Sequence, residues 1–165
     1  MQEQFEIERK FLIGYPDPRV LREQPDCRVV EIEQTYLVEK NGKESRVRVW
    51  REDGRTVYIK TEKEKVGKLR RIEREGEITR TEYEALLILA DPTKRTLHKT
   101  RYRIPYAGKL LEIDVYPFWQ DRAILEVELS DENEPIAFPP YLRMIREVSG
   151  EKEYKNKTLA RRDLS

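Results

Sequence analysis

The chain has 165 residues, a length that fits one domain with a modest core, so we treat residues 1–165 as a single domain. Charged residues make up 39% of it, well above the roughly 25% of an average soluble protein, yet 33 basic residues nearly cancel 32 acidic ones. A net charge of +1 gives no general attraction for duplex nucleic acid or an anionic membrane, and no apolar run is long enough to cross a bilayer. The single cysteine excludes an internal disulfide, so we expect a cytoplasmic protein.

The first predicted strand covers residues 5–11 and alternates strictly between charged and apolar side chains. Glu6, Glu8 and Lys10 share one face of this strand, and apolar residues occupy the other. Such a charged row is either a solvated sheet surface or the lining of a charged site. Recurrence of the pattern along the chain decides between the two.

Prolines in residues 15–25 leave room for one short helix. Residues 29–38 predict a strand, but their mixed pattern does not show which of its two faces points inward. An Asn-Gly pair at 41–42 and an Asp-Gly pair at 53–54 are strong signals for tight hairpins. We therefore expect three consecutive antiparallel strands in this part of the chain.

The charged face returns in the two strands that follow these turns. Arg46 and Arg48 share a face with valines opposite, and Lys60 lies on the charged face of the next strand. The basic segment that begins at Thr61 and ends at Arg71 has two interpretations, a mobile loop or an extended hairpin arm.

The next strand, residues 71–78, carries acidic side chains in phase, namely Glu73, Glu75 and Glu77. A helix is expected from Thr79, with Thr81 and Glu84 as a capping box. The apolar positions that we expect to be buried on this helix are Leu86, Leu87, Leu89 and Ala90.

Strands resume over residues 97–104, 109–116 and 123–129, again with alternate charged positions. Their in-phase bases are Lys99, Arg101 and Arg103, and their in-phase acids are Glu112, Asp114, Glu126 and Glu128. After these strands we expect a short helix through Leu142, Met144 and Ile145, and a terminal helix over residues 154–162.

The signs of the in-phase charges are segregated strand by strand, although mixed charges on neighbouring strands would be more stable on a plain exposed sheet. A polyanion held by the basic rows and bridged to the acidic rows by hard divalent cations would explain the segregation. Many strands converge on one ligand when an antiparallel sheet closes into a barrel. We therefore expect an α+β fold: a closed antiparallel β-barrel with a charged interior, flanked by a few α-helices.

Several motifs resemble those of the CYTH proteins, also called triphosphate tunnel metalloenzymes, and they occur in order over nearly the whole chain. They are Glu6-x-Glu8-x-Lys10, Arg46-x-Arg48, Lys60, Glu73-x-Glu75-x-Glu77-Ile78, Lys99-Thr100-Arg101-Tyr102, Glu112-Ile113-Asp114-Val115, Glu126-Val127-Glu128-Leu129 and Tyr154-x-Asn156-x-x-Leu159-Ala160. The first motif alone is weak, because charged strands are common; the ordered set is specific.

The resemblance implies an eight-stranded tunnel that binds a triphosphate-containing small molecule with Mg²⁺ or Mn²⁺. Phosphate binding is implied for Lys10, Arg46, Arg48, Lys60, Lys99, Arg101 and Arg103. Metal binding is implied for Glu6, Glu8, Glu126 and Glu128, with Glu73, Glu75 and Asp114 as further contributors. A catalytic role is expected for Glu6, Glu8, Asp114, Glu126 and Glu128.

Members of this family hydrolyse inorganic triphosphate, thiamine triphosphate or nucleoside triphosphates, and some cyclise ATP. Hydrolysis of inorganic triphosphate is the leading hypothesis, because no base- or ring-recognition motif is evident and the chain lacks the His-Phe pair of the cyclase-like members. The alternatives are a class IV-like adenylate cyclase, a nucleoside or thiamine triphosphatase, and a non-catalytic polyphosphate-binding module. Gly76 departs from the aromatic residue common at its position. The sequence is compatible with a monomer or a homodimer.

Overall fold

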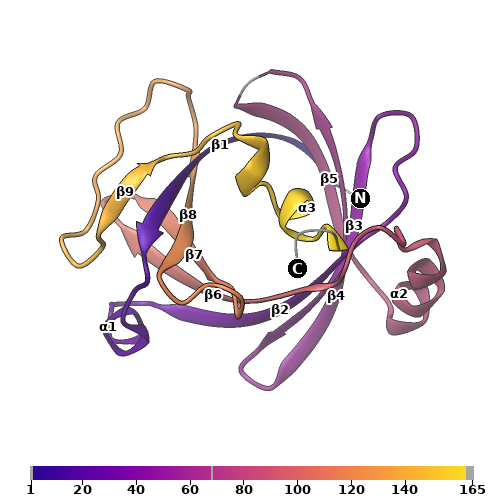
Figure 1. Ribbon diagram of the computed structural model, residues 1–165, viewed down its shortest axis with the longest axis horizontal. Coiled ribbons are helices and arrows are strands. Elements are labelled where there is room, and N and C mark those ends of the chain that lie inside the picture. Colours follow the sequence, from indigo (N-terminus) through magenta and orange to yellow (C-terminus); the bar gives the residue numbers. More distant parts are fainter. Residues whose placement is uncertain (1, 68, 163–165) are drawn as a thin grey trace.

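The computed structural model describes residues 2–67 and 69–162, and its main feature is a closed antiparallel barrel (Figure 1). The barrel strands are β1 (Gln2–Gly14), β2 (Arg28–Tyr36), β3 (Glu44–Glu52), β4 (Arg55–Lys65), β5 (Arg70–Ile78), β6 (Leu97–Tyr106), β7 (Lys109–Val115) and β8 (Arg122–Leu129). They follow the order β5-β4-β3-β2-β6-β7-β8-β1, and pairing between β5 and β1 closes the ring. The predicted eight-stranded barrel is therefore confirmed.

Strand β1 is long enough to serve three neighbours. One edge pairs with β8, while the other pairs first with β5 and, at Phe11–Ile13, with a ninth strand β9 (Met144–Glu147). The prediction of a helix through Leu142, Met144 and Ile145 is wrong, because the edge of β1 beyond β5 offers backbone hydrogen bonds that residues 144–147 take up as a strand.

Both predicted tight hairpins are present. Asn41 and Gly42 have φ of 54° and 71°, and Asp53 and Gly54 have φ of 49° and 75°. Positive φ at both central positions is the requirement of a type I′ turn, whose twist matches that of the flanking strands. The segment from Thr61 onward continues β4 to Lys65 and pairs with β5, so it is the extended hairpin arm.

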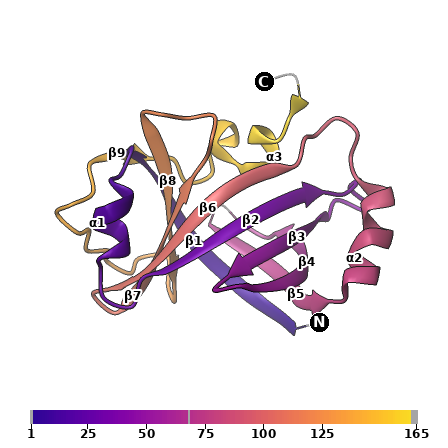
Figure 2. The same cartoon turned by 90° about the horizontal axis from the view of Figure 1, so that it is seen from below.

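The helices are short and lie outside the barrel or at its end (Figure 2). They are α1 (Pro18–Arg22), α2 (Arg80–Leu86), η1 (Leu87–Leu89), η2 (Lys152–Tyr154) and α3 (Asn156–Leu159). The capping box of α2 is formed by Thr79 and Glu82, two residues before the predicted pair. No helix in the described part of the chain combines the length and apolar character needed to cross a bilayer.

The predicted buried stripe of the second helix is wrong. None of the residues of α2 and η1 is buried, and Ile88 and Leu89 are 85% and 44% exposed. Tyr83 packs against Tyr58 of β4 with ring centroids 5.0 Å apart, so α2 contacts the barrel through this ring. The helix lies beside the barrel instead of covering its core.

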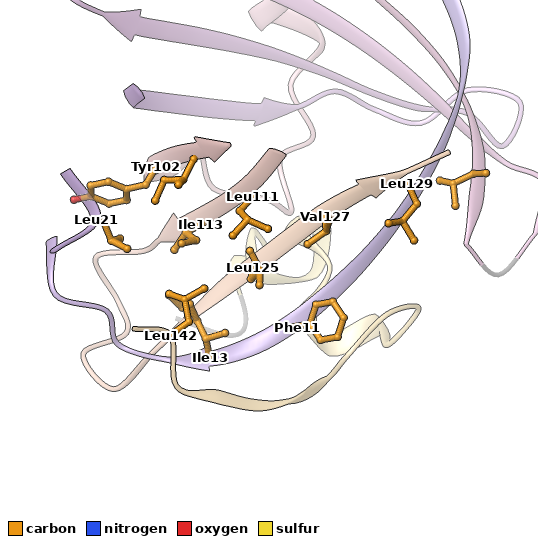
Figure 3. Close-up of a cluster of buried hydrophobic side chains, with 13 residues drawn as sticks. Phe11, Ile13, Leu21, Tyr102, Leu111, Ile113, Leu125, Val127, Leu129 and Leu142 are labelled. Carbon is orange, nitrogen blue, oxygen red and sulfur yellow. The ribbon is translucent and has the colours of Figure 1, made fainter. Parts of the chain in front are cut away.

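The main hydrophobic core lies on the outer face of β1, β6, β7 and β8, as Figure 3 shows. Its buried members include Phe11, Ile113, Leu125 and Val127, at positions that alternate with the charged residues. Leu21 of α1 and the segment around Leu142 complete the cluster. Because the apolar faces are covered from outside, the charged faces of these strands point into the barrel.

A second apolar cluster lies under the C-terminal helices. It contains Leu12, Tyr36, Leu97, Tyr116, Ile124, Val148, Leu159 and Ala160. Several of these residues continue the inward-facing rows of β1, β2, β6 and β8, so the interior changes from charged to apolar towards α3. Tyr116 donates a hydrogen bond to Asn156, which fixes α3 at this end of the barrel.

Candidate active site

The barrel encloses a cavity of about 370 Å³ whose walls are mainly charged. Its basic residues are Lys10, Arg46, Arg48, Lys63, Lys65, Arg71, Arg101, Arg103, Lys155 and Lys157. Its acidic residues are Glu6, Glu8, Glu39, Glu44, Glu73, Glu75, Glu112, Glu126 and Glu128. Ten bases and nine acids among the described residues nearly balance, so the cavity suits a ligand that brings both signs, such as a polyanion with its cations.

Most of the residues that the sequence singled out meet in this cavity. They are Glu6, Glu8, Lys10, Arg46, Arg48, Glu73, Glu75, Arg101, Arg103, Glu126 and Glu128. They come from five strands, β1, β3, β5, β6 and β8, and each of these strands contributes alternate positions. Strand β7 adds Glu112. Lys60, Lys99 and Asp114 do not line it, and Glu77 is exposed to solvent.

The Lys60 side chain points away from the barrel interior, so its predicted place in the tunnel is wrong. It pairs with Val47, whereas Arg46 pairs with Thr61, and residues paired directly across two strands point to the same face. The Lys60 Nζ is 3.4 Å from an oxygen of Glu62 on that outer face. The inward positions of β4 are therefore Thr61, Lys63 and Lys65.

Asp114 and Lys99 form a buried ionic cluster with Arg101 next to the cavity. The Asp114 side chain is fully buried; its Oδ1 and Oδ2 accept from Arg101 Nε and Nη2 at 2.8 and 2.9 Å, and Lys99 Nζ lies 2.9 Å from Oδ2. Although burial favours the neutral acid, Arg101 and Lys99 hold the pKa of Asp114 well below its usual range. Both carboxylate oxygens contact these cations, so Asp114 positions Arg101 at the edge of the cavity.

The arginines form a cationic wall, and two of them have a buried donor without a hydrogen-bond partner. Arg46, Arg48 and Arg101 are all buried, and the Nε atoms of Arg46 and Arg48 have no hydrogen-bond partner. Burial and the charges of Arg46 and Arg101 lower the pKa of Arg48 to about 10, against the opposing effect of Glu75. Planar guanidinium donors held together against their mutual repulsion are suited to a multiply charged anion such as phosphate.

Glu75 links the basic wall to the acidic one. Its carboxylate accepts from Arg48 Nη2 at 2.9 Å and from the Thr61 hydroxyl at 2.8 Å. Burial would raise the pKa of Glu75, but Arg48 and the hydrogen bonds lower it. Glu75 is therefore charged and orients Arg48 at the cavity wall.

The acidic wall contains two cations that the sequence analysis did not include. Lys63 Nζ lies 3.2 Å from Glu6 Oε1 and 3.7 Å from Glu73 Oε2. Arg71 Nη1 lies 2.8 Å from Glu8 Oε1 and 3.5 Å from Glu6 Oε1. Lys63 of β4 thus lies between carboxylates of β1 and β5, and Arg71 of β5 lies between two carboxylates of β1. The predicted segregation of signs therefore fails within β5 as well as between neighbouring strands.

The pKa values of Glu6 and Glu73, two neighbouring carboxyl groups of the acidic wall, are shifted in opposite directions. Burial raises the pKa of Glu73 to about 9, aided by its hydrogen bond with Glu6, while Lys63 opposes the shift. Burial acts in the same sense on Glu6, but Lys63 and the hydrogen bond from Glu73 outweigh it and lower the pKa of Glu6 to about 2. Near neutral pH, Glu73 is the proton donor and Glu6 the carboxylate.

The sequence contains a signal that places Lys63 inside the barrel. A two-residue turn at Asp53-Gly54 pairs residue 52 with residue 55, and counting back along both strands pairs Arg46 with Thr61. Lys63 and Lys65 then follow on the inner face. Lys155 and Lys157, which reach the cavity beside α3, carry no such signal, because the docking of that helix depends on tertiary packing.

Comparison with known proteins agrees with this geometry. Residues 4–162 match the family described as "CYTH domain". An inorganic triphosphatase of Nitrosomonas europaea (strain ATCC 19718 / CIP 103999 / KCTC 2705 / NBRC 14298) is 36% identical over 160 residues, which cover 94% of this chain and 96% of that protein. The crystal structure of the inorganic triphosphatase NE1496 superposes with a TM-score of 0.55 at 31% identity, covering 94% of this chain and 93% of that one.

The fold is also found in the PH1819 protein from Pyrococcus horikoshii OT3. It superposes with a TM-score of 0.57 at 22% identity, over 78% of this chain and 80% of that one. Fold and cavity together define a barrel protein with a charged tunnel. The chain belongs to the CYTH domain family, the family of triphosphate tunnel metalloenzymes.

Proposed function

We propose that this protein hydrolyses inorganic triphosphate with Mg²⁺ or Mn²⁺ as cofactor. The observation that carries the proposal is the cavity that arginines and glutamates line together. The similarity to an inorganic triphosphatase over nearly the full length of both chains supports the same substrate.

The arginines would bind the phosphate chain. Arg48 and Arg101 are held in place by Glu75 and Asp114, so their donors are already oriented. Arg46 is buried beside them with an Nε that has no hydrogen-bond partner. Preorganised cations of this kind stabilise the charge that develops on the leaving diphosphate, and loss of one such donor typically slows catalysis by about 10²–10³-fold. Lys10, whose Nζ is 3.6 Å from Glu126, would complete the phosphate site.

The glutamates would hold the cation. Carboxylate oxygens are the ligands that Mg²⁺ and Mn²⁺ prefer. Burial together with the charges of Glu6, Glu112 and Glu8 raises the pKa of Glu128, so this group of carboxylates lacks sufficient positive charge. Glu6, Glu8, Glu126 and Glu128 are therefore the proposed ligands, with Glu73 and Glu75 beside them.

A divalent cation bound there would neutralise phosphate oxygens and lower the pKa of a water ligand. Among the described residues, no three acidic side chains lie close enough together to coordinate one metal ion. Glu6 and Glu8 point inward from alternate positions of one strand, so modest side-chain rotations would bring them to a common ion.

The aromatic side chains favour an inorganic substrate over a nucleotide. The Trp50 ring at the cavity is already contacted by two guanidinium groups, with the Cζ atoms of Arg48 and Arg103 at 5.6 and 5.5 Å from its centroid. Trp119 packs against Tyr116 and Phe118. Both rings are thus already in contact with side chains of this chain, which disfavours their use as stacking platforms for a base or a thiamine ring.

A substrate panel tests the proposal. Inorganic triphosphate, ATP and thiamine triphosphate would each be incubated with Mg²⁺ and with Mn²⁺, and orthophosphate, diphosphate and cyclic AMP would be quantified. We expect orthophosphate, formed fastest from inorganic triphosphate. Cyclic AMP with diphosphate from ATP would instead identify a cyclase, and tight binding without turnover would identify a polyphosphate-binding module.

A further inference from the structure

Two basic side chains, Lys63 and Arg71, lie among the acidic side chains of β1 and β5. Lys63 lies between Glu6 and Glu73, and Arg71 lies between Glu6 and Glu8. All of these side chains line the cavity. The position of a bridging cation is therefore already filled by groups that belong to the chain.

We propose that Lys63 and Arg71 are internal counter-cations of the metal site: they neutralise the carboxylates before a divalent cation binds, yield them to that cation, and then present their charges to the phosphate chain. The inference rests on the proposed function for its second half, the phosphate contact. Its first half, competition with a divalent cation, is independent of turnover.

Lys63 is held loosely enough to be exchanged. Its ammonium makes one contact of hydrogen-bond length, 3.2 Å to Glu6, while its 3.7 Å separation from Glu73 Oε2 leaves that oxygen without a hydrogen bond. A lysine carries a compact charge on a flexible stem, so it can leave one partner for another without backbone movement. A purely structural contact would be expected to place the ammonium within hydrogen-bond distance of both acidic side chains.

The Lys63 ammonium has a second group of partners within the cavity, the phosphate oxygens that the arginines would hold. Lys63 belongs to the same inward row of β4 as Thr61, whose hydroxyl bonds Glu75 beside Arg48. An ammonium that leaves Glu6 within this cavity moves towards the space faced by the arginines. Release would add a cation to the phosphate wall only when metal is present, so metal and triphosphate would favour each other's binding.

The test is the affinity for Mn²⁺ alone, without phosphate, measured by calorimetry on the native chain, Lys63→Met and Lys63→Arg. We expect Lys63→Met to bind Mn²⁺ at least about 5-fold more tightly and Lys63→Arg to stay near the native value. Lys109→Met is the matched control: Lys109 is equally ion-paired, to Glu134 at 2.6 Å, with a side chain 15% exposed against 13% for Lys63, but it lies away from the cavity. It should leave Mn²⁺ affinity unchanged.

A second titration uses an imido-bridged triphosphate that resists hydrolysis, at saturating Mn²⁺. Lys63→Met should bind it about 10-fold more weakly than the native chain, opposite in direction to the Mn²⁺ effect, which general damage to the fold would not produce. Equal or weaker Mn²⁺ binding by Lys63→Met overturns the inference. If the native chain still releases phosphate from triphosphate in that case, the proposed function stands and only the exchange is lost.

Discussion

Replacement of Asp114 by asparagine separates a structural from a metal-binding role for this residue. In the fold, one fully buried carboxylate neutralises two buried cations, Arg101 and Lys99, through contacts of 2.8 to 2.9 Å. Asparagine keeps the shape but removes the charge, so both cations lose their closest anion. The destabilisation should therefore appear without metal or substrate.

The expected size follows from the burial of the cluster. Removing one partner of a buried ion pair costs about 3–5 kcal/mol, because the remaining charge is left in a poorly solvating environment. For a chain of this length each kcal/mol lowers the unfolding temperature by roughly 2–4 °C, so Asp114→Asn should melt roughly 6–20 °C below the native protein. Adding Lys99→Met removes one of the unpaired cations and should restore part of the loss.

The assay is urea and thermal unfolding in EDTA without phosphate, so that ligand binding adds nothing to stability. Glu77→Gln is the control, because Glu77 is exposed and lies away from the cavity, so its replacement should change the free energy of unfolding by less than about 0.5 kcal/mol. If Asp114→Asn unfolds at the native midpoint and loses only metal affinity, the structural role assigned to Asp114 is refuted.

Three further predictions concern other parts of the chain. The pKa of Glu73 is 4.5 in the unfolded chain and about 9 in the folded one. The stability that the protonated side chain contributes is therefore complete below pH 4.5 and is lost as the pH rises through about 9. Glu73→Gln should make the free energy of unfolding, measured in EDTA, depend less on pH across this range. Lys63→Met should raise the KM for triphosphate while Lys60→Met should not, and the reverse result in steady-state assays would show that β4 is shifted by one residue. Ile113→Ala, in the outer core, should lower the free energy of unfolding by about 2–5 kcal/mol, whereas Ile88→Glu, at an 85% exposed position, should leave it nearly unchanged in urea titrations.

Much of the fold was predictable because the charged residues alternate so regularly. Glu6, Glu8 and Lys10 on one strand and Arg101 and Arg103 on another mark the inner face, and both glycine turns fix hairpins. A strand face that carries only charges can be stable inside a barrel when apolar residues such as Ile113 are covered from outside. The same logic orients β2, whose inward Gln34 and Tyr36 the sequence alone left unassigned.

The errors have physical causes. The face of Lys60 depends on strand register, and a shift of one residue reverses every side chain on a strand. The leucines after Thr79 have helical spacing, but that spacing does not reveal whether another element covers them, and Leu89 is largely exposed. Residues 144–147 form a strand because β1 extends beyond β5, a tertiary feature without a local signal.

The central claim is that opposed charged walls act together on one triphosphate. Its most direct test is the rate of orthophosphate release from inorganic triphosphate with Mg²⁺ or Mn²⁺ for the native chain, for Glu6→Gln on the acidic wall and for Arg48→Met on the basic wall. Each variant should be slower by about 10²-fold or more, and the native rate should vanish in EDTA. A native rate that survives EDTA, or either variant working at the native rate, would contradict the account.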